Sequence, residues 1–424
     1  MYTPSEQSSD SVNKKPRIMV EECNQLAGDG LVEPFSKSPE ILILEPFLGD
    51  SHKLLVDTLT QHVFSKTNVV SLPGKKFHWV MRTGSLLLAS QIDVEKEYDV
   101  VVASASFNLA ELLVQRPLLL NAFKVLYFHE NQLEYPVQRG ESSDYQFGFI
   151  QIISALAADK LIFNSCYNRD SFFSRVDAHI NKIPISSRPR NIAAELQAKA
   201  CAILPLPLLH IHIISSHSSI NDDDDDSAMH PPQSGEGENS PLIILWNHRV
   251  EHDKGVESFC AVMEELLQTA PPHSFEAVLL GQRFSEVPDC WTALEQALSK
   301  REALRHSGYL ASFPDYLRLL SQADVVVSTA LHEFQGISLM EATALGAWPL
   351  APQRLAYPEW LPPPHLYRTD KQLLKALRQC LRPERLAVLR KERATTAELA
   401  QSFRWAGASS AALWQAIFTG GSGP

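Results

Sequence analysis

The chain has 424 residues, of which 45% are hydrophobic and 21% are charged. This length exceeds that of most single domains, and the apolar content is enough for a large core, so two domains are expected. No stretch approaches ~20 uninterrupted apolar residues, and the first 38 residues have no apolar signal-peptide region, so the sequence predicts neither a membrane-spanning nor a secreted protein. The six cysteines form no C-x-x-C pair, which makes a disulfide framework or a cysteine-based zinc site improbable and favours a cytoplasmic setting.

The formal net charge of −11 is concentrated in two segments. Residues 1–38 hold six acids and four bases, and residues 215–240 hold seven acids and no base. The other 360 residues carry a charge of only −2, so the net charge neither supports nor excludes a nucleic-acid partner.

Those two segments also divide the chain. Residues 1–38 have no sustained apolar period and are predicted to be a disordered leader. Their fragment KKPR at 14–17 has the composition of a nuclear signal, although a solvated tail is the simpler interpretation. The Ser- and Asp-rich segment 215–240 is predicted to be a disordered linker or insertion. An N-terminal domain over 39–214 and a C-terminal domain over 241–424 remain.

In the first of these domains, near-continuous apolar runs alternate with longer amphipathic stretches. The runs predict buried strands at 41–44, 99–104, 124–128 and 160–163. After the linker, the pattern predicts strands at 242–246, 275–280, 324–328 and 347–351, and helices at 254–268, 312–322 and 336–346. The last stretch, with Trp405, Trp414 and Phe418, is expected to be a closing helix that packs back on the first domain. We therefore expect an α/β protein of two doubly wound, Rossmann-like domains that face each other across a ligand cleft.

The most informative motif follows a predicted strand of the second domain. Glu333 and Glu341 stand eight positions apart, on either side of Gly336. If a helix begins here, the amides of Gly336, Ile337 and Ser338 would suit a phosphate. The two carboxylates would then suit the hydroxyl groups of a nucleotide sugar, whereas a surface helix with one buried glutamate is the alternative.

Further candidates lie in the loops that follow the first strand of each domain. Arg249 and Lys254 can neutralise the charge on a leaving diphosphate, or they are solvated surface charges. Gly49 would let the backbone approach a phosphate or a sugar. Helix capping by Asp50 or Ser51 is the alternative for that turn.

Two further groups of polar residues belong to the first domain. His129, Glu130 and Asn131 follow a predicted strand, where a density of hydrogen-bonding side chains is more often functional than structural. Glu130 and Asn131 are candidate acceptor contacts. Basic and aromatic residues alternate in a second group, which suits RNA through phosphate contact and base stacking; solvated charge is the alternative. Its candidate acceptor contacts are Lys76, His78 and Arg82. More basic residues lie in the outer part of this domain, at Arg169, Arg175, Lys182, Arg188 and Arg190.

Five segments carry a resemblance to known proteins: EPFLGDSH at 45–52, KKFHW at 75–79, FHENQL at 128–133, HRVEHDK at 248–254 and HEF at 332–334. In this order they resemble one family, the tRNA-queuosine α-mannosyltransferases. The resemblance covers residues 40–214 and 241–415. More broadly, the two glutamates with the Arg249 and Lys254 loop resemble the retaining GT-B glycosyltransferases. Asp50 stands where a second glycine is expected in the first turn.

The resemblance implies transfer of mannose from GDP-mannose to queuosine at the wobble position of aspartate tRNA, without a metal or another cofactor. By that resemblance Glu333 would hold the sugar and Glu341 the ribose, Arg249 and Lys254 would hold the diphosphate, and His129 would lie by the reacting sugar. The leaving phosphate oxygen would take the proton of the acceptor. The alternatives are a lipid or small-sugar acceptor, or a catalytically silent GT-B scaffold. The sequence does not indicate an oligomeric state.

Overall fold

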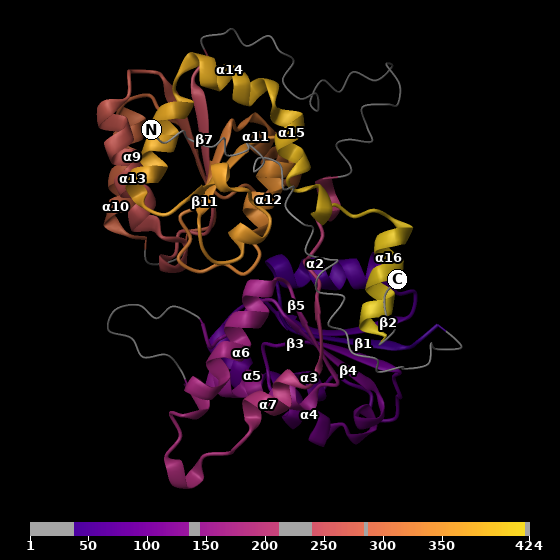
Figure 1. The fold of residues 1–424 in the computed structure, drawn as a ribbon. Helices are drawn as coiled ribbons and strands as arrows, with labels where there is room; N and C mark the ends of the chain where they lie inside the picture. Colours follow the sequence, from indigo (N-terminus) through magenta and orange to yellow (C-terminus); the bar gives the residue numbers. More distant parts are fainter. Residues whose placement is uncertain (1–37, 135–144, 212–239, 284–286, 420–424) are drawn as a thin grey trace, which may run out of the picture.

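The computed structural model describes residues 38–134, 145–211, 240–283 and 287–419 (Figure 1). The predicted leader and linker lie almost wholly outside the described residues, and both remain predictions. The described chain forms two parallel sheets, each of six strands and each with helices along it. Among these residues, no helix has both the length and the apolar character needed to cross a membrane.

The first sheet has the strand order β2-β1-β3-β4-β5-β6. Its strands are β1 (Ile41–Leu48), β2 (Thr67–Pro73), β3 (Val100–Ser104), β4 (Phe123–Phe128), β5 (Lys160–Phe163) and β6 (Ala200–Ile203). Successive residues of β1 point to opposite faces, so Leu42 and Leu44 join one core while Ile41 and Ile43 join another. Both faces of this sheet are therefore covered, which explains its continuous apolar runs.

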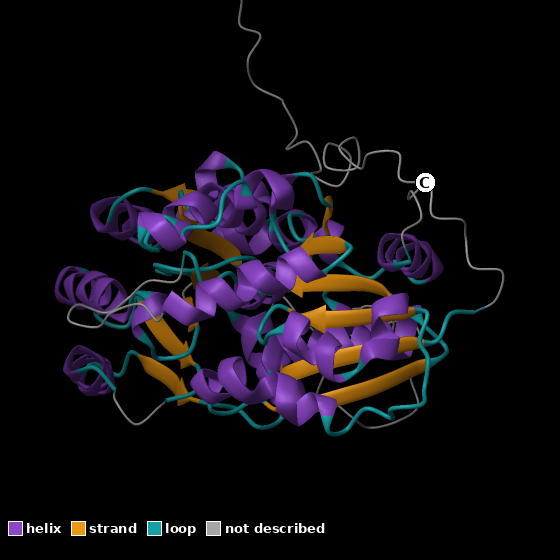
Figure 2. Cartoon of the chain, turned by 90° about the horizontal axis from the view of Figure 1, so that it is seen from below, coloured by secondary structure: helices purple, strands orange, loops and turns teal. Residues whose placement is uncertain are grey.

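The two faces of the first sheet are covered by different helices. The first core includes residues of α3 (Phe77–Ala89), α4 (Leu109–Gln115), α5 (Tyr145–Ala157), α6 (Cys166–Ile180) and α7 (Ile192–Gln197). The opposite core includes residues of α2 (Asp50–Thr58), the following helical turn η1 (Leu59–Val63) and the C-terminal helix α16 (Ala408–Phe418). Seen from below, helices lie on both sides of the strands (Figure 2).

The second sheet has the order β12-β11-β10-β7-β8-β9. Its strands are β7 (Leu242–Asn247), β8 (Phe275–Leu280), β9 (Leu304–Gly308), β10 (Val325–Val327), β11 (Trp348–Pro352) and β12 (Leu366–Tyr367). Its helices are α9 (Val256–Thr269), α10 (Asp289–Lys300), α11 (Phe313–Gln322), α12 (Ile337–Ala344), α13 (Asp370–Cys380), α14 (Pro383–Lys391) and α15 (Arg393–Glu398). The α/β fold of two doubly wound domains is therefore confirmed, and the three helices expected in the second domain correspond to α9, α11 and α12.

The strands that the sequence failed to predict share one property. They are β2, β6, β9 and β12, which are the two edge strands of each sheet. An edge strand has a neighbour on one side only, so its residues are less completely buried and need not be continuously apolar. The polar β9, with the sequence LRHSG, is the clearest case.

The C-terminal helix returns to the first domain, as the sequence predicts. Trp414, Ile417 and Phe418 of α16 are buried against the first sheet, and Gln415 donates a hydrogen bond to the carbonyl oxygen of Val63. The segment 241–424 thus contains a helix that is packed on the other domain (Figure 1).

The strand order determines where the chemistry can gather. In the first sheet β1 lies between β2 and β3, and in the second sheet β7 lies between β8 and β10. The connections leave in opposite directions at these positions, which opens a crevice at the carboxyl ends of the strands. The loops after β1 and β3 therefore meet in the first domain, and those after β7 and β10 meet in the second.

Candidate functional site

A compact charge network occupies the crevice of the second domain. Lys254 ends the short helical turn η6 (His252–Lys254) after β7, while Glu333 lies in the loop after β10. The Lys254 Nζ atom lies 3.3 Å from a Glu333 carboxylate oxygen and 3.2 Å from an Asp253 carboxylate oxygen. Burial lowers the pKa of Lys254, but these two carboxylates reverse the effect and raise it. A buried ammonium group is thus held charged at the strand ends.

Glu333 is fixed from several sides. Its other carboxylate oxygen accepts hydrogen bonds from the backbone N–H groups of Phe334, Gln335 and Gly336, at 3.1, 3.3 and 3.0 Å. Although burial favours the protonated acid, Lys254 and these bonds lower the pKa of Glu333 to about 2. The carboxylate is therefore ionised at neutral pH.

The start of the next helix differs in one detail from the expectation. The amide of Gly336 is not available to a phosphate as predicted, because it donates to Glu333. Gly336 has a φ of +86°, and a Cβ atom there would lie 2.9 Å from the ring of Tyr357, so this position requires glycine. Ile337 and Ser338 begin α12, as predicted, and the side-chain amide of Asn247, the last residue of β7, lies 3.4 Å from the Ser338 carbonyl oxygen.

Glu341 lies half-buried one turn further along α12. A carboxylate oxygen accepts a hydrogen bond of 2.5 Å from the Tyr316 hydroxyl group, which in turn accepts one of 2.8 Å from Asn247. Burial raises the pKa of Glu341 to about 7, even though the bond from Tyr316 lowers it. Glu341 thus differs from Glu333 in being half protonated near neutral pH.

Arg249 lies at the more open side of the same crevice. Its guanidinium group is 3.1 Å from Glu251 and 3.9 Å from Asp253. Burial raises the pKa of Glu130 in the first domain, while His52 and Arg249 act against this rise. Arg249 therefore acts electrostatically on a carboxyl group of the other domain.

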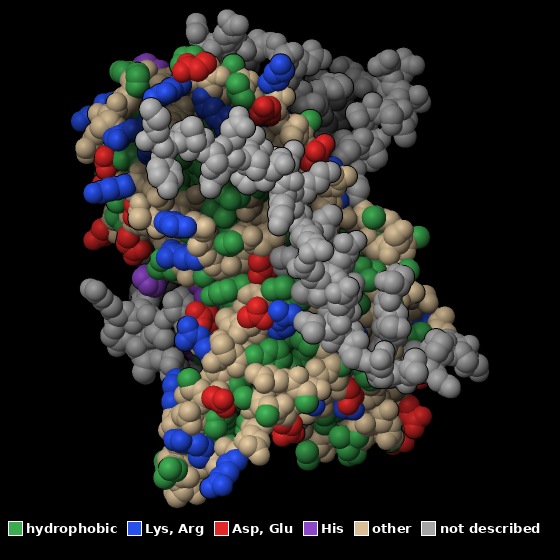
Figure 3. Space-filling model, in the orientation of Figure 1, with side chains coloured by type: hydrophobic (Ala, Val, Ile, Leu, Met, Phe, Trp, Pro, Cys, Tyr) green, Lys and Arg blue, Asp and Glu red, His purple; other side chains and the backbone are tan. Residues whose placement is uncertain are grey.

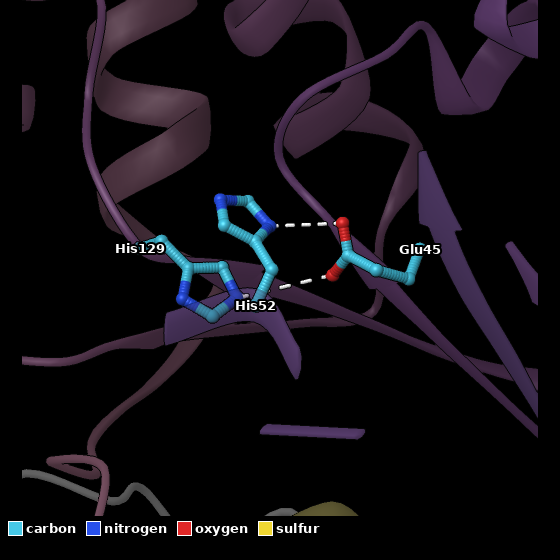
Figure 4. A group of neighbouring side chains, drawn as sticks. All are labelled: Glu45, His52 and His129. Carbon is cyan, nitrogen blue, oxygen red and sulfur yellow. Dashed lines mark hydrogen bonds and ion pairs between the residues drawn. The ribbon is translucent and has the colours of Figure 1, made fainter. Parts of the chain in front are cut away.

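Glu45, His52 and His129 lie together in the first domain, and we call them the first wall of the cleft (Figure 4). The charge network of the second domain is the second wall. The Glu45 side chain, 1% exposed, accepts a hydrogen bond of 2.8 Å from His52 Nδ1 and another from the Ser104 hydroxyl group. The His52 and His129 rings are stacked, with centroids 3.8 Å apart. Burial lowers the pKa of His52, but Glu45 outweighs it and raises that pKa.

His129 has the opposite electrostatic character. Its pKa is well below the ordinary value because the ring is buried and because His52 lies beside it. Neither ring nitrogen has a hydrogen-bond partner among the described residues, and the nearest carboxylate oxygen of Glu45 is 4.0 Å from Nε2. A neutral, unpartnered imidazole can donate a hydrogen bond to a substrate hydroxyl group or accept one from it.

These three residues are also the types that bind metals. Their ligand atoms lie within 4.8 Å of one another, so among the described residues Glu45, His52 and His129 form the group that can hold an ion. However, each carboxylate oxygen of Glu45 already accepts a hydrogen bond, from His52 and from Ser104. A metal would share these oxygens with the two hydrogen-bond donors or compete with them.

The glycine turn of the first domain lies beside this wall. Gly49 has an extended backbone and precedes α2, while Asp50 has a φ of +43°. This left-handed conformation is the one that glycine adopts most readily, which accounts for the glycine expected at Asp50. Phe47 in the same turn packs edge-on against His52 and Phe77, with centroids 5.8 and 5.6 Å apart.

Phe77 connects the turn to the predicted acceptor residues. Lys76, His78 and Arg82 are exposed around the first turns of α3, and the Arg82 guanidinium group lies 4.8 Å from the centre of the Phe147 ring. Trp79 is 66% exposed beside them. The structure thus brings cations and an exposed aromatic ring to the rim of the cleft.

Asn131 does not lie where the sequence predicts an acceptor contact. It is fully buried, and its amide group donates to the carbonyl and side-chain oxygens of Asn168 and to Ser171. Its side-chain oxygen accepts from the amide of Glu134. Asn131 therefore holds the loop after β4 in place, and no surface of it faces an acceptor.

Several residues of the site were not predicted. Glu45 and His52 lie in a segment that was singled out for Gly49, although a glutamate inside the apolar strand β1 is itself a signal of a buried polar contact. Tyr316 lies on α11, far from the motif in sequence. Glu359 accepts hydrogen bonds from the amides of Cys166 and Tyr167 at the start of α6, and so joins the two domains.

The chain was compared with known proteins. A family model described as tRNA-queuosine alpha-mannosyltransferase N-terminal matches residues 40–208. A tRNA-queuosine alpha-mannosyltransferase of Drosophila melanogaster is 35% identical over 361 residues, which are 84% of this chain and 90% of that protein.

Solved structures share the fold at low sequence identity. The Anabaena protein Alr3699/HepE, in complex with UDP, has a TM-score of 0.56 at 16% identity, covering 86% of this chain and 96% of its own. The sucrose-phosphate synthase of Thermosynechococcus elongatus has a TM-score of 0.61 at 13% identity, covering 86% and 95%. Together with the two doubly wound domains, these likenesses establish the GT-B fold. The identity to the fly protein shows that the chain is a glycosyltransferase and belongs to the tRNA-queuosine α-mannosyltransferase family.

Proposed function

We propose that this glycosyltransferase moves mannose from GDP-mannose to queuosine at the wobble position of aspartate tRNA, with retention of the anomeric configuration. The observation that carries the proposal is the family membership, because the fly relative is named a tRNA-queuosine alpha-mannosyltransferase. A tRNA acceptor would be met in the cytoplasm, and there we propose that the enzyme acts.

The charge network of the second domain supports a nucleotide-sugar donor. Lys254 and Arg249 would neutralise the negative charge that grows on the GDP leaving group as the glycosidic bond breaks. Because two cations are already held there, the reaction as proposed needs no metal. Glu341 would accept hydrogen bonds from the ribose hydroxyl groups.

The sugar would lie between Glu333 and His129, with the acceptor entering from the first domain. In a retaining reaction on one face, the acceptor oxygen attacks the anomeric carbon while the bond from that carbon to the phosphate oxygen breaks. The acceptor proton would pass to the departing phosphate oxygen. Glu130 would lie near the acceptor, whereas Lys76, His78 and Arg82 would contact the RNA around it.

The test is a transfer assay with the full-length protein. It is incubated with GDP-mannose and queuosine-containing aspartate tRNA in the presence of a chelator, and the nucleosides are analysed by mass spectrometry. UDP-glucose and tRNA without queuosine are the controls. We expect queuosine to gain one hexose with GDP-mannose only, and an α-mannosidase to remove it.

The other outcomes are equally informative. Transfer from UDP-glucose would refute the donor, and transfer only without chelator would refute the metal-free reaction. Binding of GDP-mannose without transfer to tRNA would refute the acceptor and direct attention to a lipid or a small sugar.

A further inference from the structure

A loop between α6 and α7 projects from the first domain, and we call residues 181–191 the finger. It forms the extension at the base of Figure 1 and contains one short helical turn, η3 (Ile185–Ser187). Ile185 at this turn is 86% exposed. The finger therefore adds little to the core of the domain.

The finger is basic although the whole chain is acidic. Its charged residues are Lys182, Arg188 and Arg190, and it contains no acid, whereas the chain has a net charge of −11. Lys182 and Arg190 are exposed, and blue side chains gather over this region in Figure 3. The nearest acids in sequence, Asp177 and Glu195, lie on the helices that flank it. The finger thus carries a local positive charge.

The finger is also held in a definite shape. The Arg188 side chain donates hydrogen bonds to the carbonyl oxygen of Asn181 at 2.6 Å and to that of Ile183 at 2.9 and 3.1 Å. The Ser187 amide donates to the Pro184 carbonyl oxygen at 2.9 Å. These bonds close the loop on itself, so little conformational entropy would be lost when a ligand binds.

The position of the finger relative to the cleft is fixed by α6. The first residues of that helix, Cys166 and Tyr167, meet Glu359 of the second domain at the cleft. The helix has 15 residues, so at ~1.5 Å per residue the finger begins roughly 22 Å beyond that contact. The helix α6 belongs to the same helical layer as α3, whose exposed basic residues lie at the rim of the cleft.

We propose that the finger binds the phosphate backbone of the tRNA outside its modified nucleotide. The inference rests on the proposed function, since a wobble nucleotide in the cleft requires the rest of the tRNA to lie along the outer surface. RNA arms are polyanions that proteins recognise largely through phosphates and shape. A rigid basic loop some distance from the cleft has that chemistry, and it would increase affinity for tRNA without contacting the reacting atoms.

The test removes the exposed charges and leaves the shape. The double variant Lys182→Ala/Arg190→Ala keeps Arg188, which closes the loop. A matched control, Lys371→Ala/Lys375→Ala, removes two exposed charges from α13 in the second domain. Steady-state kinetics with queuosine tRNA, tRNA binding at several salt concentrations, and transfer to the free queuosine nucleoside are measured for each.

For the finger variant we expect KM for tRNA to rise several-fold while kcat and KM for GDP-mannose stay unchanged. The plot of log affinity against log salt concentration should become shallower by about 1.4 to 1.8, as expected for two lost phosphate contacts. Transfer to the nucleoside should equal that of the wild type. The control should behave as the wild type in every assay.

The proposal is overturned if the finger variant has the tRNA affinity and salt dependence of the wild type. It is also overturned if the α13 control loses as much affinity, because the effect would then reflect net charge alone. If the wild type transfers no mannose, the proposed function fails, and the salt-dependent tRNA binding of the two variants still decides the role of the finger.

Discussion

The two walls of the cleft use charge in different ways. In the second domain, Lys254 lies within 3.3 Å of both Asp253 and Glu333, so its charges are close together and mutually compensated. In the first domain, His129 is buried, neither of its ring nitrogens has a hydrogen-bond partner among the described residues, and burial lowers its pKa well below the ordinary value. Under the proposed function, the second wall would meet the charged diphosphate, and the first wall would meet the neutral hydroxyl groups of the sugar and the acceptor.

Of the changes that test this difference, removal of Glu333 is expected to have the largest effect on activity. Glu333→Ala takes away a partner of Lys254 and leaves three backbone amides without their acceptor. We expect kcat/KM to fall on the order of 10²- to 10³-fold, the usual result when a stabilising polar contact is lost from a transition state.

The transfer assay checks this prediction, with thermal unfolding as a test of folding. Glu384→Ala, an exposed position on α14, is the matched control. A Glu333→Ala enzyme that folds and retains activity within a few-fold of the wild type would contradict the assignment and favour a role in structure only.

Weakening the contact between the two domains should have the next largest effect, which is a loss of stability. Glu359→Ala removes the acceptor for the Cys166 and Tyr167 amides at the domain contact. We expect a loss of about 1–2 kcal/mol of stability, since polar groups lose their partners. Hydrogen exchange at these two amides should accelerate, whereas Glu359→Gln, which keeps an oxygen acceptor, should change it less. Unchanged exchange in both variants would refute the contact.

The pH dependence of donor binding tests whether Glu341 of the second domain binds the donor in its ionised form. With a pKa of about 7, Glu341 is mostly protonated below that pH and mostly ionised above it. An ionised carboxylate accepts two hydrogen bonds from ribose hydroxyl groups, whereas the protonated acid accepts them less well. KM for GDP-mannose should therefore fall several-fold as pH rises from 6 to 8.

Glu341→Gln supplies the control, because its amide does not titrate in this range. Its KM should be independent of pH between 6 and 8. If the wild-type KM is equally constant, Glu341 does not contact the ribose in the way proposed.

The smallest expected effect concerns the first wall. Glu45 raises the pKa of His52 above its ordinary value, so folded stability from this pair is present below pH 6.5 and is lost as pH rises through the pKa of the folded state. In Glu45→Gln the pKa of His52 should fall, and this part of the pH dependence of unfolding should disappear.

Nuclear magnetic resonance titration of the histidine rings measures the pKa of His52 directly, in the wild type and in Glu45→Gln. His179, which is distant in sequence and hydrogen-bonded to the Tyr145 carbonyl oxygen, serves as an internal reference. An unchanged pKa for His52 in Glu45→Gln would show that the carboxylate does not control its protonation.

The sequence was most informative where burial is complete. Every strand in the interior of a sheet was predicted, because its residues are apolar on both faces, and every edge strand was missed. The Glu333 and Lys254 loops were found because they follow interior strands.

Contacts between distant segments could not be found in this way. Glu359 and Tyr316 act through partners that are 193 and 25 residues away in sequence, and no local pattern marks them. Asn131 illustrates the opposite error: a polar residue at a strand end looked functional, but its hydrogen bonds are satisfied inside the protein.

The C-terminal helix has a consequence for how the chain matures. A protein emerges from the ribosome from its first residue, and domains generally fold in that order. Here Phe64 of the first domain packs against Phe418 of α16, and Trp414 lies in the same core. The domain that is made first thus keeps an apolar face uncovered until α16 has been synthesised.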